Sequence, residues 1–297
     1  MPAGTPVLSV ADRGFQVGDG VFETVRVREG RILELPQHAA RLASSAATLE
    51  IPLGAGVEAV LRAAIAELLA ADALIAPGLE VSVRITVSRG PVEGRNLLPP
   101  ESVTPTMAVQ AWPVVPPSHE LLERGLHLVI AGVRRDPRNP LATVKTTSRA
   151  EFVYARLEAR RAGADDALFL TVDGHLAEAT SSSLFLVRSA RSGVTEPVRC
   201  ELATPSLACG ILVGTTREWL LTWAPSVGLV PVQALLTPAD LFAADEAFVA
   251  SSVAGVLPVT HVDGRPIGEG LPGPWARRAR DAREAFVRGE AFVRGGA

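Results

Sequence analysis

The sequence predicts a mixed α/β protein that is divided into two domains. Patterns typical of strands and of helices alternate in both halves of the chain, and 297 residues are enough for two domains or for one large one. Three prolines fall within residues 113–117, which indicates a linker. We therefore expect a smaller N-terminal α/β domain at 1–112, an interdomain linker at 113–119, a larger C-terminal domain at 120–289 and a tail at 290–297.

The elements of the first half are distinguished by their apolar periodicity. Residues 7–35 are interrupted by glycines and predict short extended segments. Alternation of apolar and polar residues predicts strands at Val21–Val27, Glu80–Val87 and Met107–Trp112. Apolar residues at helical spacing predict helices at Leu35–Leu49, with a proline near its start, and at Val57–Asp72.

The second half continues the alternation of strands and helices. Its predicted strands are Leu126–Val133, Ala167–Val172, Leu184–Val187 and Glu246–Ala250, with a turn at Asp173-Gly174 after the second of them. Its predicted helices are Arg149–Ala162, Thr215–Trp223 and Trp275–Val287. Ser148 and Glu151 have the spacing of a capping box at the start of the first of these helices.

The composition argues against several classes of function. The net charge of -3 gives no electrostatic reason to expect binding to nucleic acid or to an anionic membrane. The chain contains no run of about 18 apolar residues, and residues 1–10 lack the basic start and apolar core of a signal peptide. Two cysteines are too few for a disulfide framework, and the five histidines form no close cluster that predicts a metal site. We therefore expect a cytoplasmic protein without a metal.

Lysine is almost absent from the chain. Of 29 lysine and arginine residues, only Lys145 is a lysine. A coding bias that also enriches alanine, glycine and proline explains this scarcity without any function. A functional explanation is that arginine cannot replace lysine where an amine must attack a carbonyl, because guanidinium is a poor nucleophile. Lys145 is thus a candidate for binding the aldehyde of pyridoxal phosphate, and the alternative is a surface loop lysine.

Pyridoxal phosphate chemistry also needs an acid at the ring nitrogen and a site for the phosphate. Glu178 stands alone between small and apolar residues and is a candidate for the acid, although a strand-edge glutamate facing water has the same pattern. The segment Gly210–Arg217 is a glycine-bounded turn that opens a helix, where Thr215 and Thr216 offer hydroxyls to a phosphate. An ordinary helix N-cap is the alternative. Ser252 follows a buried strand and offers a further hydroxyl.

Arginines supply candidate positive groups. Arg41 shares one helix face with His38 and is placed to reach a phosphate, with a surface ion pair as the alternative. Arg26 lies on the strand after the glycine-rich start, where it can meet a substrate carboxylate.

Taken in order, these segments resemble the class IV family of pyridoxal phosphate enzymes, which contains branched-chain and D-amino acid aminotransferases and aminodeoxychorismate lyases. The resemblance runs from Asp12 to about Gly289, and its motifs are weak singly but specific as an ordered set. They are Asp12–Thr24 (DRGFQVGDGVFET), His38–Leu42 (HAARL), Lys145, Arg160–Ala167 (RRAGADDA), Ala177–Ala179 (AEA), Gly210–Arg217 (GILVGTTR), Ala250–Ser252 (ASS), Asp263–Gly268 (DGRPIG) and Pro272–Pro274 (PGP).

The resemblance implies fold type IV, in which pyridoxal 5'-phosphate lies between two domains, and a homodimer. It implies that Lys145 holds the cofactor as a Schiff base and carries the catalytic proton, and that Glu178 pairs with the ring nitrogen. The implied phosphate contacts are Arg41, Thr215, Thr216 and Ser252. The implied substrate contacts are Arg26, Phe22, Arg149 and Arg95.

The resemblance leaves the reaction open. We expect an aminotransferase that moves an amino group between a small amino acid, D or L, and a 2-oxo acid. The alternative is an aminodeoxychorismate lyase that forms 4-aminobenzoate and pyruvate, which Arg149 favours. Ser148, Arg149 and Ala150 stand where branched-chain enzymes usually have an asparagine and a tyrosine. Specificity for branched-chain amino acids is therefore disfavoured. A non-catalytic binding protein of this fold is also disfavoured, because Lys145 and Glu178 are retained.

Overall fold

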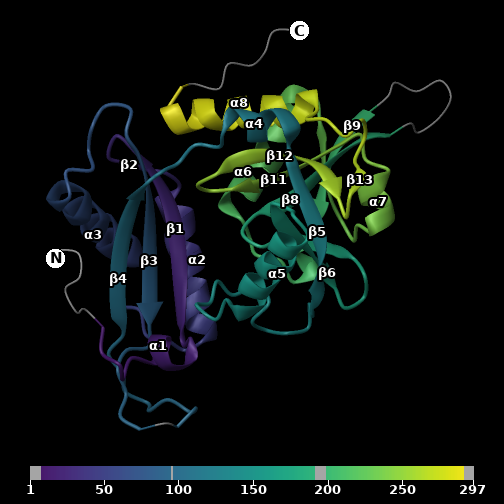
Figure 1. Cartoon of the computed structure of the whole chain (residues 1–297). Helices are drawn as coiled ribbons and strands as arrows, with labels where there is room; N and C mark the ends of the chain where they lie inside the picture. Colours follow the sequence, from purple (N-terminus) through teal and green to yellow (C-terminus); the bar gives the residue numbers. More distant parts are fainter. Residues whose placement is uncertain (1–7, 95, 191–198, 291–297) are drawn as a thin grey trace. The chain divides into compact units, whose positions relative to one another are not determined.

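The computed structural model describes residues 8–94, 96–190 and 199–290, and the chain divides into two compact units (Figure 1). The first unit contains Met1–Val114 together with Val144–Arg149, and the second contains Val115–Thr143 together with Ala150–Ala297. The short segment that carries the only lysine thus belongs to the first unit, although the residues on both sides of it in the sequence belong to the second. Both units contain helices and strands, which confirms the mixed α/β prediction.

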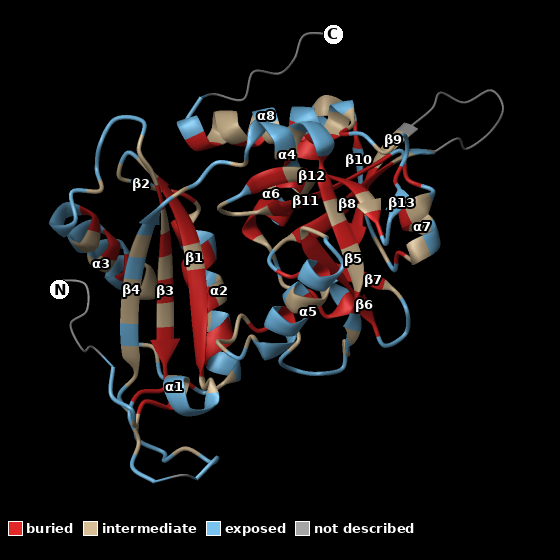
Figure 2. Cartoon of the chain, viewed as in Figure 1, coloured by how far each residue is buried: buried red, intermediate tan, exposed pale blue. Residues whose placement is uncertain are grey.

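A four-stranded antiparallel sheet forms the first unit. Its strands, in spatial order, are β2 (Arg31–Ile32), β1 (Gly20–Arg28), β3 (Glu80–Ser88) and β4 (Thr106–Pro113). Helices α2 (Leu35–Thr48) and α3 (Val57–Ala71) cover one face of this sheet (Figure 1). Alternate residues of β1 and β3 point toward these helices and are buried with them. In Figure 2, β1 is mostly red and β3 alternates between red and tan. The strands and helices predicted for this unit are confirmed.

Helix α1 (Arg13–Val17) forms where the sequence predicted extended segments, so that prediction was wrong. The Asp12 side chain caps the helix by accepting a hydrogen bond from the Gly14 amide at 2.8 Å. Gly18 ends it in the left-handed region, at φ 69°. Five residues are too few to show apolar periodicity, and only these two capping residues could have indicated the helix.

A nine-stranded sheet forms the second unit. Its main path is β10 (Val230–Ala234), β9 (Arg199–Pro205), β8 (Ser183–Ala190), β11 (Glu246–Ser251), β12 (Gly255–Val262), β5 (Leu126–Arg135), β6 (Asp166–Thr171) and β7 (Leu176–Ala179), and β13 (Arg265–Pro266) pairs with β12. An additional pairing of β7 with β8 joins Glu178 to Ser183. The strands from β8 through β11, β12, β5 and β6 to β7 therefore form a closed ring.

The longer helices of the second unit pack against this sheet. Helix α5 (Ala150–Arg161) contacts β5 and β6, α6 (Thr215–Trp223) contacts β11, and α8 (Pro274–Arg288) contacts β11 and β12. The shorter helices are α4 (His119–Arg124), η1 (Leu207–Cys209), η2 (Ala224–Val227) and α7 (Pro238–Phe242). The two residues of the predicted capping box have other partners. The Ser148 hydroxyl donates to the Gly18 carbonyl, and the Glu151 carboxylate accepts from Arg135.

Strands β7, β9, β10 and β12 were not predicted from the sequence. The predicted turn at Asp173-Gly174 is present, but it leads from β6 into β7 rather than directly into the strand at 184–187, which is part of β8. Strand β7 has only four residues, Leu-Ala-Glu-Ala, so it offers too short a pattern to identify. Its pairing with two neighbours, β6 and β8, is what makes it a strand.

Two kinds of feature are absent from the part of the chain that the structure describes. None of its helices is long and apolar enough to cross a membrane. No group of three or more histidine, cysteine, aspartate and glutamate side chains within it is arranged to hold a metal ion.

Candidate functional site

Lys145 is held at the edge of the first unit's sheet by its own backbone. Its carbonyl accepts a hydrogen bond from the Phe22 amide at 2.9 Å, and its amide donates to the Ser45 hydroxyl at 3.2 Å. The Thr147 amide donates to the Gly20 carbonyl at 2.8 Å, which continues the pairing along β1. The backbone of the lysine is therefore fixed, while its side chain is only partly buried.

Three positively charged side chains surround the ring of Phe22. The Lys145 Nζ lies 4.8 Å from the ring centroid, and the guanidinium carbons of Arg84 and Arg149 lie 3.9 Å and 5.8 Å from it. Attraction between these cations and the face of the buried aromatic ring stabilises the arrangement. It brings together two residues that the sequence analysis singled out for substrate binding, Phe22 and Arg149, with the candidate lysine.

Arg84 was missed by the sequence analysis. It pairs with Thr24 across the sheet, so side-chain alternation places it on the same face as Phe22 and opposite the helices. Its Nε donates to the Thr86 hydroxyl at 3.2 Å, and among the described residues it forms no ion pair with a carboxylate. Burial lowers the pKa of the Arg84 guanidinium below its ordinary value. An arginine on this face of an alternating strand was the available signal.

Arg26 occupies the same face but has a partner of opposite charge. Its guanidinium pairs with the carboxylate of Glu80, to which its Nε donates at 2.7 Å, and Arg28 pairs with the same carboxylate. Its guanidinium is therefore directed to a carboxylate of the neighbouring strand. Arg95, the fourth residue expected to contact substrate, lies outside the described residues.

On the opposite face of β1, Glu23 is fully buried between two residues of α2. Arg41 donates to both of its carboxylate oxygens, at 2.6 and 2.7 Å, and the His38 Nδ1 lies 2.7 Å from one of them. Burial by itself would raise the pKa of Glu23, but the hydrogen bonds from Arg41 and His38 lower it to about 2. The carboxylate is therefore ionised and fixes the plane of the Arg41 guanidinium. The sequence analysis paired His38 with Arg41 but did not identify Glu23.

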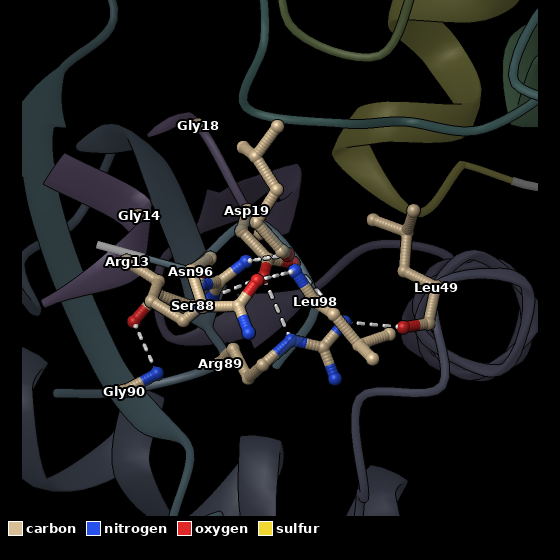
Figure 3. A network of polar contacts seen from close by, with 12 residues as sticks. Arg13, Gly14, Gly18, Asp19, Leu49, Ser88, Arg89, Gly90, Asn96 and Leu98 are labelled. Atoms are coloured by element: carbon tan, nitrogen blue, oxygen red, sulfur yellow. Dashed lines mark hydrogen bonds and ion pairs between the residues drawn. The ribbon is translucent and has the colours of Figure 1, made fainter. Parts of the chain in front are cut away.

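A half-buried carboxylate, Asp19, organises the end of the first unit that contains α1. Figure 3 shows it between two arginines, with Arg13 donating at 2.7 Å and Arg89 at 2.7 and 3.1 Å. Burial would raise the pKa of Asp19, but the hydrogen bonds from Arg89 and Arg13 keep it below its usual range. Both arginines also donate to backbone carbonyls, including those of Asn96 and Leu49. These contacts indicate a structural role for Arg89.

In the second unit, Glu178 is a buried carboxylate on β7 between two buried alanines. One carboxylate oxygen lies 3.5 Å from the Arg135 guanidinium, and the other accepts a hydrogen bond from the Leu212 amide at 3.3 Å. These contacts stabilise the ionised form of the carboxylate. The structure therefore disfavours the alternative of a glutamate that faces water.

The predicted anion site lies at the N-terminus of α6. Gly214 is the N-cap residue and forms no side-chain capping bond, so the first turn keeps amide donors available. The Thr215 and Ser252 hydroxyls are 3.0 Å apart, which joins two predicted phosphate contacts. The Thr216 hydroxyl is buried and has no hydrogen-bond partner among the described residues. Because leaving a buried hydroxyl unpaired is costly, this atom fits a site for an anionic ligand.

Each unit by itself offers groups that suit one part of a phosphorylated pyridine aldehyde. The first unit offers an amine in Lys145 and cations around Phe22. The second offers the ionised carboxylate of Glu178 and hydroxyls with amide donors at the start of α6. An amine, a carboxylate and an anion site are the groups that pyridoxal phosphate requires of a protein.

Comparisons with known proteins lead to one family. The model of amino-transferase class IV matches residues 20–262. The D-alanine aminotransferase of Bacillus licheniformis is 30% identical over 95% of this chain and 93% of its own length. The structure of a 4-amino-4-deoxychorismate lyase from Pseudomonas aeruginosa has a TM-score of 0.77 and 31% identity over 94% of each chain.

A further solved structure is that of the T.th. branched-chain amino acid aminotransferase with pyridoxamine 5'-phosphate. It has a TM-score of 0.84 and 28% identity, and the match covers 98% of this chain and 92% of that one. The family model and the relatives agree over most of the chain's length. The chain belongs to the class IV aminotransferase family, whose members depend on pyridoxal phosphate.

Proposed function

We propose that this enzyme is a pyridoxal 5'-phosphate-dependent aminotransferase that moves an amino group between an amino acid and a 2-oxo acid. The observation that carries the proposal is the placement of Lys145, the only lysine, with a fixed backbone and its amine beside Phe22. Membership of a pyridoxal phosphate-dependent family and likeness to two aminotransferases support it. The relatives are enzymes, which disfavours a purely binding role.

Each group of residues has a part in this proposal. The bound cofactor supplies an electron sink for the substrate carbon that loses a proton. Lys145 holds the cofactor aldehyde through its amine and then moves a proton at the substrate carbon. Glu178 keeps a proton on the ring nitrogen. The hydroxyls of Thr215, Thr216 and Ser252 bind the phosphate, together with Arg41 in the plane that Glu23 sets.

For the substrate, the contacts favour Arg84 over Arg26. Arg84 lies on the same aromatic ring as the Lys145 amine, whereas the guanidinium of Arg26 is directed to Glu80. Arg84 forms no carboxylate pair among the described residues and lies on the ring of Phe22. We therefore assign substrate contact to Phe22, Arg84 and Arg149, with an amino acid and a 2-oxo acid as the small-molecule partners.

An aminodeoxychorismate lyase is the second candidate function. It is supported by the 31% identity to the lyase from Pseudomonas aeruginosa and by the position of Arg149 beside Phe22. The lyase reaction needs the same amine and the same carboxylate, so these residues do not distinguish it from amino transfer.

Two incubations separate the candidates. The purified enzyme, supplied with cofactor, is given either D-alanine with 2-oxoglutarate or aminodeoxychorismate. Pyruvate formed with a matched amount of glutamate supports amino transfer, whereas pyruvate formed with 4-aminobenzoate supports the lyase. A Lys145→Arg variant keeps the charge but not the nucleophile, and we expect its turnover to fall by roughly a thousandfold or more. Turnover at the wild-type rate in this variant would contradict the assigned role of Lys145.

A further inference from the structure

Arg135, at the end of β5, is a buried arginine outside the residues assigned above. Its guanidinium contacts four separate segments of the second unit. One terminal nitrogen lies 3.5 Å from the Glu178 carboxylate and donates to the carbonyls of Ala142 at 2.5 Å and Gly210 at 3.0 Å. The other donates to the Glu151 carboxylate at 3.0 Å.

Three of the segments that meet at Arg135 are ones that the proposed function uses. Glu178 is the proposed partner of the ring nitrogen, and Ala142 precedes Lys145 by three residues. Gly210 opens the turn that leads to the N-terminus of α6. One planar side chain therefore links the carboxylate, the loop before the lysine and the turn before the phosphate site.

The loop that contains Pro137 and the turn at Gly210 also pack directly against each other. Gly210 has a φ of 65°, and a Cβ added there would lie 2.8 Å from the Pro137 Cα. The two backbones thus approach closely beside Arg135. The Leu212 amide of the turn also donates to Glu178, so the carboxylate is held from both sides.

A purely structural role explains this residue poorly. Burial of a guanidinium is costly, and here its Nε has no hydrogen-bond partner among the described residues. The rings of Phe152 and Phe169, at 5.1 and 5.9 Å, offset part of that cost. Only a planar group with several donors can serve these acceptors together, and a lysine cannot.

We propose that Arg135 is a positioning residue that holds the Glu178 carboxylate in register with the loop that contains Ala142 and with the turn that leads to α6. This inference rests on the proposed function, because it assigns Arg135 an effect on turnover through Glu178. It makes no contact with substrate itself.

The test compares steady-state kinetics of the cofactor-loaded Arg135→Gln and Arg135→Lys variants with wild type. We expect kcat to fall by roughly thirtyfold or more in Arg135→Gln, with KM changed less than about threefold, and Arg135→Lys to lie between this variant and wild type. The matched control is the neighbouring Arg134, which is exposed and whose guanidinium donates, among the described residues, only to the Ala131 carbonyl. Arg134→Gln should retain the wild-type kcat.

A double-mutant cycle with Glu178→Gln separates positioning from general destabilisation. If Arg135 acts through Glu178, the kcat of the double variant should lie within about threefold of that of Glu178→Gln alone. If the fold-loss of kcat in the double variant equals the product of the losses in the two single variants, the inference is overturned. A kcat in Arg135→Gln equal to that of wild type would also overturn it. If Arg135→Gln does not fold, the same cycle is carried out with Arg135→Lys.

The two proposals fail in different ways. A wild-type enzyme with no cofactor absorbance band and no turnover would refute the proposed function itself. A wild-type enzyme that has the absorbance band and turns over, together with Arg135 variants whose kcat equals that of wild type, would refute only the role of Arg135. The core variant Leu241→Ala, in α7, controls for lost stability, because it should lower Tm without lowering kcat.

Discussion

At the scale of single residues, Glu23 combines complete burial with a full negative charge. Its hydrogen bonds to Arg41 and His38 hold its pKa at about 2, against 4.5 for an unperturbed glutamate. A carboxylate with a lowered folded-state pKa contributes stability that is complete above its unfolded pKa. That contribution is lost as the pH falls from about 4.5 toward 2.

This linkage predicts the effect of Glu23→Gln on stability. At pH 7 the wild-type protein should be more stable than the variant by about 3 kcal/mol, the free energy of a pKa shift of this size. The difference should shrink as the pH is lowered below 4.5. Urea unfolding of both proteins between pH 7 and pH 3 measures it. Glu58→Gln, at an exposed pair with Arg62, should behave like wild type, and an equally large loss in that variant would contradict the explanation.

Arg84 and Arg26 provide a second residue-scale prediction. If Arg84 contacts the substrate carboxylate, Arg84→Gln should raise KM roughly tenfold, the effect of losing one charge-assisted hydrogen bond. Arg26→Gln should instead lower Tm with little change in KM, because it breaks the pair with Glu80. Kinetics with varied amino acid and 2-oxo acid test both variants. An unchanged KM in Arg84→Gln would exclude the contact.

Residues with distinctive chemistry were the ones that sequence reasoning could find. Lys145 and Glu178 were singled out from their type and their neighbours alone. Glu23, Arg84 and Arg135 were missed because their importance comes from partners far away in the sequence. For Arg135 these distant partners lie 43 and 75 residues away, at Glu178 and Gly210.

At the scale of elements, the N-terminus of α6 is organised around hydroxyls rather than a capping side chain. The sequence predicted both this helix and the turn before it, because a glycine-bounded turn followed by threonines is a local pattern. Strand β7 was not predicted, because its pairing with β6 and β8 depends on the closed sheet. Local patterns thus predicted the helix and turn of the proposed phosphate site but not the strand that carries Glu178.

The unpaired hydroxyl of Thr216 predicts opposite effects on stability and on cofactor binding. Thr216→Val removes a buried polar atom that has no partner among the described residues, so the Tm of the cofactor-free protein should stay the same or rise. The dissociation constant for pyridoxal phosphate should rise roughly fivefold, since one hydrogen bond is lost. Calorimetry and a fluorescence titration measure the two effects. Unchanged cofactor affinity would remove Thr216 from the phosphate site.

At the scale of the whole molecule, chain order does not match spatial grouping. The segment Val144–Arg149 clusters with the first unit although the strands and helices on either side of it belong to the second. Prolines in the sequence can indicate a domain boundary, but they cannot show that a later segment packs against the first unit. This packing arises from the pairing of Thr146 and Thr147 with β1. The fold class followed from local periodicity, whereas this arrangement follows from long-range pairing.

Exposed apolar side chains of the first unit favour the homodimer that the family resemblance implies. Val10, Phe15, Leu97 and Leu98 are each more than 70% exposed. Leu97 and Leu98 are neighbours in the sequence, and contiguous apolar surface left in water is typical of an interaction surface. Light scattering should therefore give a mass twice the 31.2 kDa of one chain. A double variant with Leu97→Asp and Leu98→Asp should shift the mass toward one chain, while a wild-type mass of one chain would contradict the proposal.

The central claim is that Lys145 holds the cofactor aldehyde. The most direct test is borohydride reduction of the cofactor-loaded enzyme, followed by mass spectrometry of its peptides. The enzyme should absorb in the region of about 400–430 nm, lose that band on reduction and carry the reduced cofactor on the peptide with Lys145. An enzyme without the band, or with reduced cofactor only on its N-terminal amine, would contradict the account.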